Sequence, residues 1–85
     1  LLSTPLHRAS ANNHLNVVNL LLSYGADPRL QDSDGQTSLH KACENGSKEV
    51  ISILKGKNVE TIRDNKNRVA LDCCKDEETK QILLA

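Results

Sequence analysis

Histidine and cysteine are the residue types in this 85-residue chain that could ligate a metal ion or supply a nucleophile. His7 and His40 stand 33 positions apart in similar hexapeptides, which suggests a metal-binding pair as one interpretation. No cysteine or carboxylate shares that offset, and a neutral imidazole can instead use its one donor and one acceptor within the fold. The spacing therefore favours a structural role for both histidines, and no metal site is predicted.

The three cysteines, Cys43, Cys73 and Cys74, are odd in number and two are adjacent, unlike the cysteines of a small disulfide-bonded domain. They lack the Cys-x-x-Cys spacing typical of zinc sites, and a reactive thiolate would need a nearby cation or helix start. Cys43 and Cys74 are predicted to pack as small apolar residues, whereas Cys73 is predicted on an outer face, where it could oxidise. Unpaired thiols favour a reducing compartment, the cytoplasm or the nucleus.

Acidic residues gather in two short stretches. Asp27, Asp32 and Asp34 invite comparison with a calcium loop, but Cys43 stands at the twelfth position, where an EF-hand has glutamate. Turn formation explains this stretch better, and the acidic run 76–78 is interpreted as solvated charge near a helix start. The chain also shows no nucleophile arrangement of serine, histidine and carboxylate, and no glycine-rich phosphate loop. Neither catalysis nor a cofactor is predicted.

The composition argues against two classes of partner. Eleven basic residues balance eleven acidic ones and form no run interleaved with aromatics, so nucleic acid is not expected to bind. No apolar stretch reaches the roughly 18 residues of a membrane helix, and no signal peptide is visible. Because the chain starts at Leu1 rather than at a methionine, we expect a fragment of a longer protein.

One hexapeptide organises the chain. Residues 4–9 (TPLHRA) return at 37–42 (TSLHKA) and, in a worn form, at 69–74 (VALDCC), with steps of 33 and 32 residues. Thr4 and Thr37 are expected to cap helices, and Pro5 suits a first helical position, where its missing N–H costs nothing. Within each copy the leucine and the small residue three positions later share one helix face, which is predicted to point inward.

A second helix is predicted after each of the first two copies. Apolar spacing predicts one helix over 15–23, with Asn13 as the left-handed residue before it. Ser47 is expected to cap another helix over about 48–55. In the first of these helices the inward-facing residues are predicted to be Val17, Leu20, Leu21 and Val18.

The segments between the copies carry turn chemistry, and the third copy is degraded. Asp34-Gly35 is a turn dipeptide, and Asn67 stands where a second such glycine is expected. In the third copy Val69 cannot cap a helix, and Asp72 replaces the histidine. The polar run 75–80 suits a unit that ends an array, because terminal repeats need a polar outer face.

This hexapeptide, its period and the linking segments 24–28 and 32–37 resemble the ankyrin repeat over nearly the whole chain. The resemblance implies an all-α solenoid of helix-turn-helix repeats linked by β-hairpin-like fingers. It also implies that the two histidines bind neighbouring backbone. The expected organisation is a single domain, 1–85, with repeats at about 4–33, 34–65 and 66–85.

An ankyrin fold implies a protein partner, bound by the exposed side of the first helices and by the fingers. Carried over to this chain, the helix positions are Arg8, Asn12, Lys41, Glu44 and Asn45. The finger positions are Arg29, Leu30, Gln31, Asp32, Ser33, Arg63, Asn65 and Lys66. Leu30 shares its finger offset with Ile62, so packing between the fingers is an equally open role for it.

Two functional interpretations remain open at this point. The chain is either a protein-binding module of a scaffold or regulatory protein, or the regulatory segment of a larger enzyme or channel. Because an ankyrin unit buries its apolar face only against its neighbours, self-association through the Leu1–Leu2 end is a further expectation.

Overall fold

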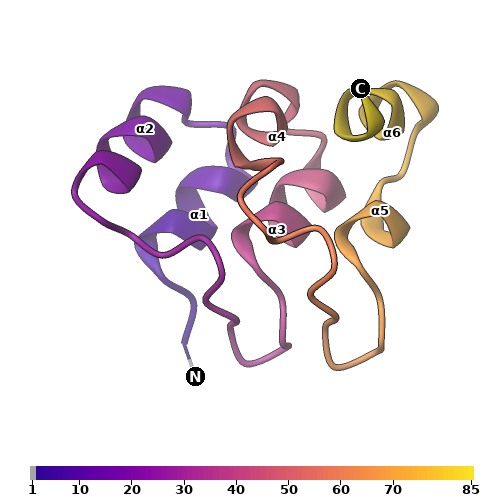
Figure 1. Cartoon of the computed structure of the whole chain (residues 1–85), viewed down its shortest axis with the longest axis horizontal. Helices are drawn as coiled ribbons and strands as arrows, with labels where there is room; N and C mark the ends of the chain where they lie inside the picture. Colours follow the sequence, from indigo (N-terminus) through magenta and orange to yellow (C-terminus); the bar gives the residue numbers. More distant parts are fainter. Residues whose placement is uncertain (1) are drawn as a thin grey trace.

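The computed structural model describes residues 2–85 as three pairs of helices joined by long loops (Figure 1). The first pair is α1 (Pro5–Ala11) and α2 (Leu15–Ser23), and the second is α3 (Ser38–Asn45) and α4 (Lys48–Leu54). The third pair is shorter, with α5 (Ala70–Cys73) and α6 (Glu77–Leu84). No strand occurs among these residues, so the predicted all-α repeat architecture is confirmed.

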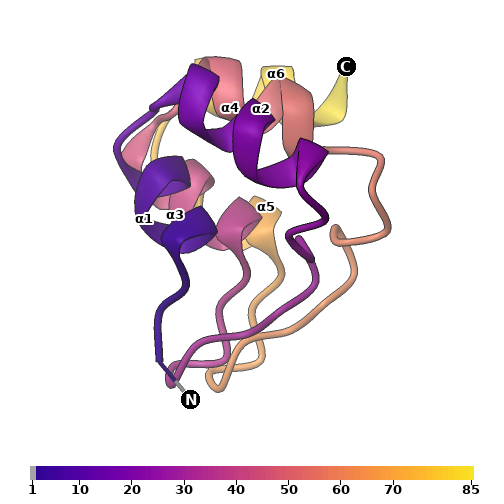
Figure 2. The same cartoon turned by 90° about the vertical axis from the view of Figure 1, so that its left-hand side faces the viewer.

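The helices form two layers, with the loops projecting to one side (Figure 2). One layer contains α1, α3 and α5, with α3 packed between the other two, and the second contains α2, α4 and α6 in the same order. We call residues 26–36 the first finger and residues 59–68 the second finger. Each finger leads into a helix of the first layer, so side chains on finger and helix can face one surface.

Two of the three first-layer helices start with a reciprocal cap. The Thr4 hydroxyl accepts the His7 backbone N–H at 3.2 Å, while the Thr4 N–H donates to His7 Nδ1 at 3.1 Å. Thr37 and His40 repeat the arrangement at the start of α3, so both predicted caps are confirmed. At α5, Val69 supplies no side-chain cap, but its N–H donates to Asp72 Oδ2 at 3.0 Å. Asp72 thus takes over half of the role of the histidine that it replaces.

The turn inside the first helix pair has the predicted left-handed residue, whereas the cap predicted for the second pair does not form. Asn13 and Gly46 both adopt positive φ, 55° and 67°. Ser47 does not cap α4, because its hydroxyl instead donates to the carbonyl of Ala11 in the preceding pair. Its role is therefore to join neighbouring repeats, and α4 ends at Leu54, one residue earlier than expected.

The core is a continuous aliphatic layer between the helix pairs. Its fully buried members are Leu39, Val50, Ile51, Leu54, Val59, Val18, Ala42 and Ala70. The prediction for α2 was wrong at two positions, because Val17 is 45% exposed and Leu20 is 55% exposed. Within residues 2–85, α2 packs mainly against α1 and α4, so Val17 and Leu20 are not covered by a further helix pair as the corresponding residues of α4 are covered by α2.

The prediction for Cys73 was also wrong, since this residue is buried with 6% of its surface exposed. Burial raises the pKa of its thiol, which leaves little thiolate for oxidation. Cys43 and Cys74 are buried as predicted, and burial raises the pKa of both thiols. All three are free thiols within the described chain.

Candidate functional site

Each finger ends in a turn that is held by one buried aspartate. Asp32 Oδ1 accepts the N–H groups of Asp34 and Gln36 at 2.9 and 3.0 Å. Asp64 Oδ1 accepts those of Lys66 and Arg68 at 2.9 and 2.8 Å. These bonds confirm the predicted turns and establish that the two fingers are equivalent position by position.

Close packing between the two fingers requires glycine at one tip. Gly35 has φ 75°, and a Cβ there would lie 2.5 Å from Asn65 Oδ1 of the second finger. The Asn65 N–H donates to the Asp34 carbonyl at 3.0 Å, and Asn65 Nδ2 donates to the Ser33 carbonyl at 2.9 Å. Gln31 Nε2 adds a bond to the Arg63 carbonyl at 3.0 Å. The fingers are therefore fixed relative to each other.

The two histidines fix the fingers to the helices. His7 Nδ1 accepts a backbone N–H, so we place the proton on Nε2, which donates to the Gln36 carbonyl at 2.7 Å. His40 Nε2 donates to the Arg68 carbonyl at 2.8 Å in the same way. Both bonds link one repeat to the finger of the next, which confirms the structural role predicted for these residues.

A polar cleft of about 250 Å³ lies where the fingers meet α3. Two of its cations are paired with the buried turn aspartates. Lys41 Nζ lies 3.8 Å from Asp32 Oδ2, and Arg68 Nε donates to Asp64 Oδ2 at 2.9 Å. The residues that line the cleft are Asp34, Gln36, Lys41, Glu44, Asn65, Lys66 and Arg68.

Asp64 stays ionised because the hydrogen bonds to its carboxylate lower its pKa more than burial raises it. Burial alone would raise the pKa of this carboxyl, but the backbone N–H groups of Arg68 and Lys66 and the Arg68 guanidinium lower it to about 2. In return, the Asp64 carboxylate raises the pKa of Arg68. The pair is thus a permanent part of the second finger and leaves the outer cations of that finger to face solvent.

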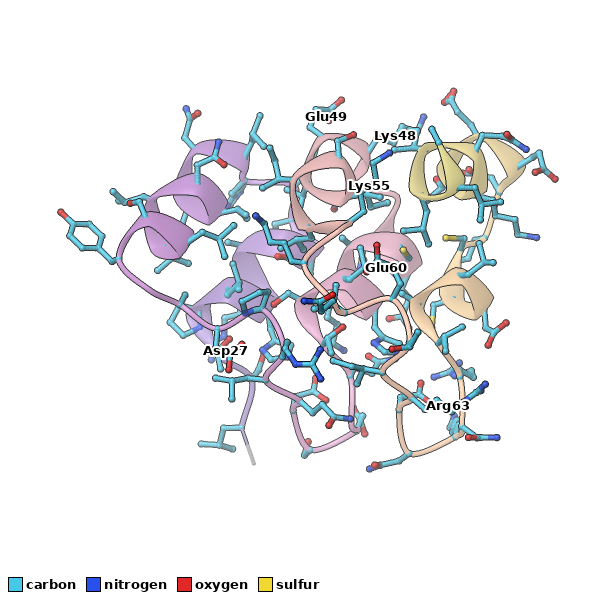
Figure 3. The ribbon with its side chains drawn as sticks, in the orientation of Figure 1. Asp27, Lys48, Glu49, Lys55, Glu60 and Arg63 are labelled. Carbon is cyan, nitrogen blue, oxygen red and sulfur yellow. The ribbon has the colours of Figure 1, made fainter. Side chains whose placement is uncertain are left out.

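Most of the predicted binding residues lie on α3 and on the two fingers. Lys41, Glu44, Asn65 and Lys66 meet at the cleft, and Ser33 and Gln31 lie on the first finger beside it. Arg63 is exposed on the second finger. Figure 3 shows it on the loop side of the molecule, away from Lys48 and Glu49 of α4, which are not among the predicted residues. Asn45 is exposed at the end of α3, with its Nδ2 donating to the Lys41 carbonyl.

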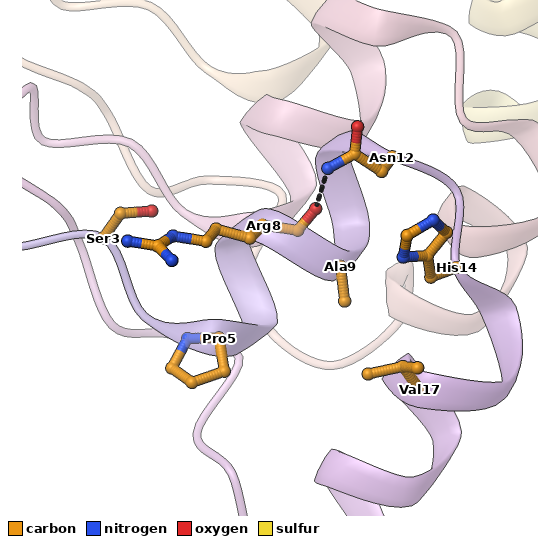
Figure 4. Close-up of a pocket in the computed structure, with 7 residues that line it drawn as sticks. All are labelled: Ser3, Pro5, Arg8, Ala9, Asn12, His14 and Val17. Atoms are coloured by element: carbon orange, nitrogen blue, oxygen red, sulfur yellow. Dashed lines mark hydrogen bonds between the residues drawn. The ribbon is translucent and has the colours of Figure 1, made fainter.

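Arg8 and Asn12 line a separate cavity of about 430 Å³ beside α1 and the start of α2. Figure 4 shows the Asn12 side chain bonded to the Arg8 carbonyl, with His14 and Val17 on the α2 side of the cavity. The remaining lining residues are Ser3, Pro5 and Ala9. These two predicted residues are therefore brought together with each other, but they do not line the cleft.

Three predicted residues have other contacts. Asp32 is only 6% exposed, because its side chain is occupied by the first finger's own turn. Arg29 Nη1 donates to the carbonyl of Asn58, which holds the base of the first finger. Leu30 is 49% exposed, whereas its counterpart Ile62 packs against the core.

Sequence reasoning missed Asp34, Gln36 and Arg68 as residues of the cleft. The period of 32 residues places Asp34 and Gln36 at the same finger offsets as Lys66 and Arg68, and Lys66 had been selected. Applying that offset to Lys66 would have found Asp34, but not Gln36 or Arg68, because neither member of that pair was among the predicted residues.

One buried group combines metal-ligating atom types. Ligand atoms of His40, Asp64 and Cys73 all lie within 4.8 Å of one another. Both nitrogens of His40 are hydrogen-bonded, and both oxygens of Asp64 accept bonds from Arg68. In the preceding repeat Lys41 stands at the position of Cys73, and it lies beside Asp32. Each of the two turn aspartates therefore has a cation of the fold beside it, since Arg68 pairs with Asp64. We assign no metal to this group, because its donors are committed to the fold.

Comparisons with known proteins agree with the repeated architecture. A family model described as "Ankyrin repeats (3 copies)" matches residues 6–85. A rice protein, probable E3 ubiquitin-protein ligase XBOS33, is 47% identical over 53 residues, which are 62% of this chain and 10% of that protein. Human NF-kappa-B inhibitor alpha is 43% identical over 51 residues, 60% of this chain and 16% of that protein.

Two further similarities bear on size and shape. The palmitoyltransferase ZDHHC13 of Pongo abelii is 55% identical over 40 residues, 47% of this chain and 6% of that protein. The crystal structure of the Bcl-3 ankyrin repeat domain superposes with a TM-score of 0.88 at 28% identity, covering 96% of this chain and 36% of that one. The chain thus spans a small part of the length of each of these relatives. Within residues 2–85, no helix is long and apolar enough to cross a membrane.

Proposed function

Because this chain belongs to the ankyrin repeat family, whose repeats are protein-interaction modules, we propose that it binds a partner protein across its fingers and first-layer helices. The cleft between the two fingers and α3 is the observation that carries the proposal. Glu44 and Lys66 present charged groups there that have no ion pair within residues 2–85, and Asn45 is exposed at the end of the same helix. Mixed charge of this kind sets the orientation and the rate of association more than the affinity.

The proposed contact surface follows the sequence prediction, with one residue given a different role. We expect Asp32 to shape the first finger rather than contact the partner, because its carboxylate is buried. The expected contact residues are Arg8, Asn12, Gln31, Ser33, Lys41, Glu44, Asn45, Arg63, Asn65 and Lys66, with Arg29 and Leu30 at the margin.

The proposal is tested with a variant that alters only the helix side of this surface. Arg8→Ala, Glu44→Ala and Asn45→Ala together should lower the affinity for a partner captured by the wild-type chain by about tenfold or more, because interface side chains are lost. Binding is measured by titrating the recovered partner against each purified variant, after their melting temperatures have been compared.

The control variant removes the same kinds of side chain elsewhere. Asn19→Ala, Lys75→Ala and Glu77→Ala alter exposed residues away from the fingers and α3, and they should leave the affinity unchanged. Equal affinity of the two triple variants for the partner would contradict the proposed surface.

A second candidate is a regulatory segment within a larger enzyme or channel. It is favoured by the similarity to an E3 ubiquitin-protein ligase and to a palmitoyltransferase, of which the matched part is 10% and 6%. In that setting the same surface would bind another part of the parent protein. The three free thiols favour the cytoplasm or nucleus for either candidate.

We also propose self-association through the open side of α1 and α2. Val17 and Leu20 are both exposed on α2, and Val17 lines the same cavity as Ala9 of α1. Exposed apolar patches commonly mark contact surfaces. Leu1 lies outside the described residues, and Leu2 is 88% exposed. Light scattering over a concentration series should therefore detect a dimer that Leu20→Glu returns to monomer. A wild-type monomer at every concentration would contradict this proposal.

A further inference from the structure

The two fingers carry different charges at equivalent positions. Because Asp32 and Asp64 make the same turn contacts, each residue of the first finger has a counterpart in the second finger. At three such positions the second finger is the more positive one. The pairs are Gln31 with Arg63, Asp34 with Lys66, and Gln36 with Arg68.

The ion pairs within the fold do not cancel this difference in charge between the two fingers. Arg68 neutralises Asp64, and Lys41 lies beside Asp32. Lys66 is exposed and has no ion pair among residues 2–85, and Arg63 donates only to the uncharged carbonyl of Asn67. The second finger therefore presents two unneutralised cations.

The first finger and α3 contribute acidic residues to the same cleft. Asp34 at the first finger tip is exposed, and Glu44 of α3 is half-buried with no ion pair in the described chain. Both residues line the same cleft as Lys66. Because the fingers are fixed to each other by Asn65 and Gln31, the acidic tip of the first finger and the basic second finger hold a constant separation.

We propose that the second finger receives an acidic segment of the partner, whose carboxylates contact Arg63 and Lys66. This inference rests on the proposed function and specifies the chemistry of the partner at that surface. Asp34 at the tip of the first finger repels the same segment, whereas Glu44 on α3 is left to contact a basic or neutral group of the partner, so the partner docks in one orientation. Like-charge repulsion of this kind suppresses wrong arrangements, while the attraction between opposite charges favours the right one.

The test is an NMR titration of the isotope-labelled chain with two probe peptides, one alternating Glu and Ser and the other alternating Lys and Ser. At low salt the Glu probe should shift the amide signals of residues 63–68 at least about threefold more than those of 31–36. The Lys probe should show the reverse preference. Equal shifts at both fingers, shifts centred elsewhere, or no shifts with the Glu probe would overturn the inference.

A charge-altered variant and its control complete the test. Arg63→Gln with Lys66→Glu should weaken binding of the Glu probe about fivefold. Lys57→Gln with Lys75→Glu makes the same change in charge at exposed residues outside the finger turn and should leave binding unchanged. If the two variants bind the probe equally, the inference fails.

The two proposals fail separately. The variant that tests the proposed function alters Arg8, Glu44 and Asn45, none of which lies in the second finger. Loss of partner affinity in that variant, without a preference of the Glu probe for residues 63–68, would overturn only the acidic-segment inference.

Discussion

Replacing Leu39 by alanine should lower the free energy of unfolding by about 2–5 kcal/mol. Leu39 is fully buried in the central helix α3, which packs against both α1 and α5. Removing its side chain therefore leaves a cavity that touches all three repeats. Domains of this size are stable by only about 5–15 kcal/mol, so a large share of the stability is at risk. Urea unfolding followed by circular dichroism measures the change.

Leu20→Ala is the matched control for this substitution. It removes the same atoms from a leucine that is 55% exposed, so it should cost much less, about 1 kcal/mol or below. Equal losses of stability in the two variants would mean that the central core is not formed around α3.

Replacing His40 by leucine should cost about 2 kcal/mol or more, although the volume of the side chain is nearly kept. The imidazole accepts the Thr37 N–H and donates to the Arg68 carbonyl, and leucine can do neither. Buried groups without a partner cost about 1–3 kcal/mol each. Because the Arg68 carbonyl belongs to the second finger, amide signals of that finger should also shift.

His14→Leu serves as the control for His40, since His14 is exposed and its side chain has no hydrogen bond within residues 2–85. Its effect should stay within about 0.5 kcal/mol. A His40→Leu variant as stable as the wild type would contradict the role of the histidine as the link between helix and finger.

The elements that sequence reasoning predicted well are those set by local chemistry. Thr4 and Thr37 cap helices because a hydroxyl can reach an N–H three residues on, whatever surrounds it. Asn67 takes positive φ, 63°, because its short side chain tolerates the left-handed region. The bounds of α2 were likewise predicted correctly from apolar spacing.

The errors concern residues whose environment depends on a neighbouring repeat. Val17 and Val50 occupy the same position in two successive repeats, yet Val17 is 45% exposed and Val50 is fully buried. The difference is that α2 covers one side of α4, while α2 itself has no such neighbour in the described chain. Ser47 was misjudged for a related reason, because its acceptor, the carbonyl of Ala11, lies 36 residues away.

The candidate site was predicted in part, for a similar reason. Lys41, Glu44, Asn65 and Lys66 were selected by their offset within the repeat, and the structure brings them to one cleft. The burial of Asp32 depends on how the finger turn folds back on its own amides. Whether a charged residue faces the turn or the solvent cannot be read from its position in the period alone.

The hydrogen bonds that join the repeats have a narrow range of separations along the chain. They connect residues 27 to 37 positions apart, which is about one period. Closing a loop between two residues costs entropy that grows with the number of residues between them. Inserting another copy between two repeats would therefore lengthen the molecule without lengthening any loop that must close. Such a chain can grow by duplication while each added unit meets the same entropic cost as the last.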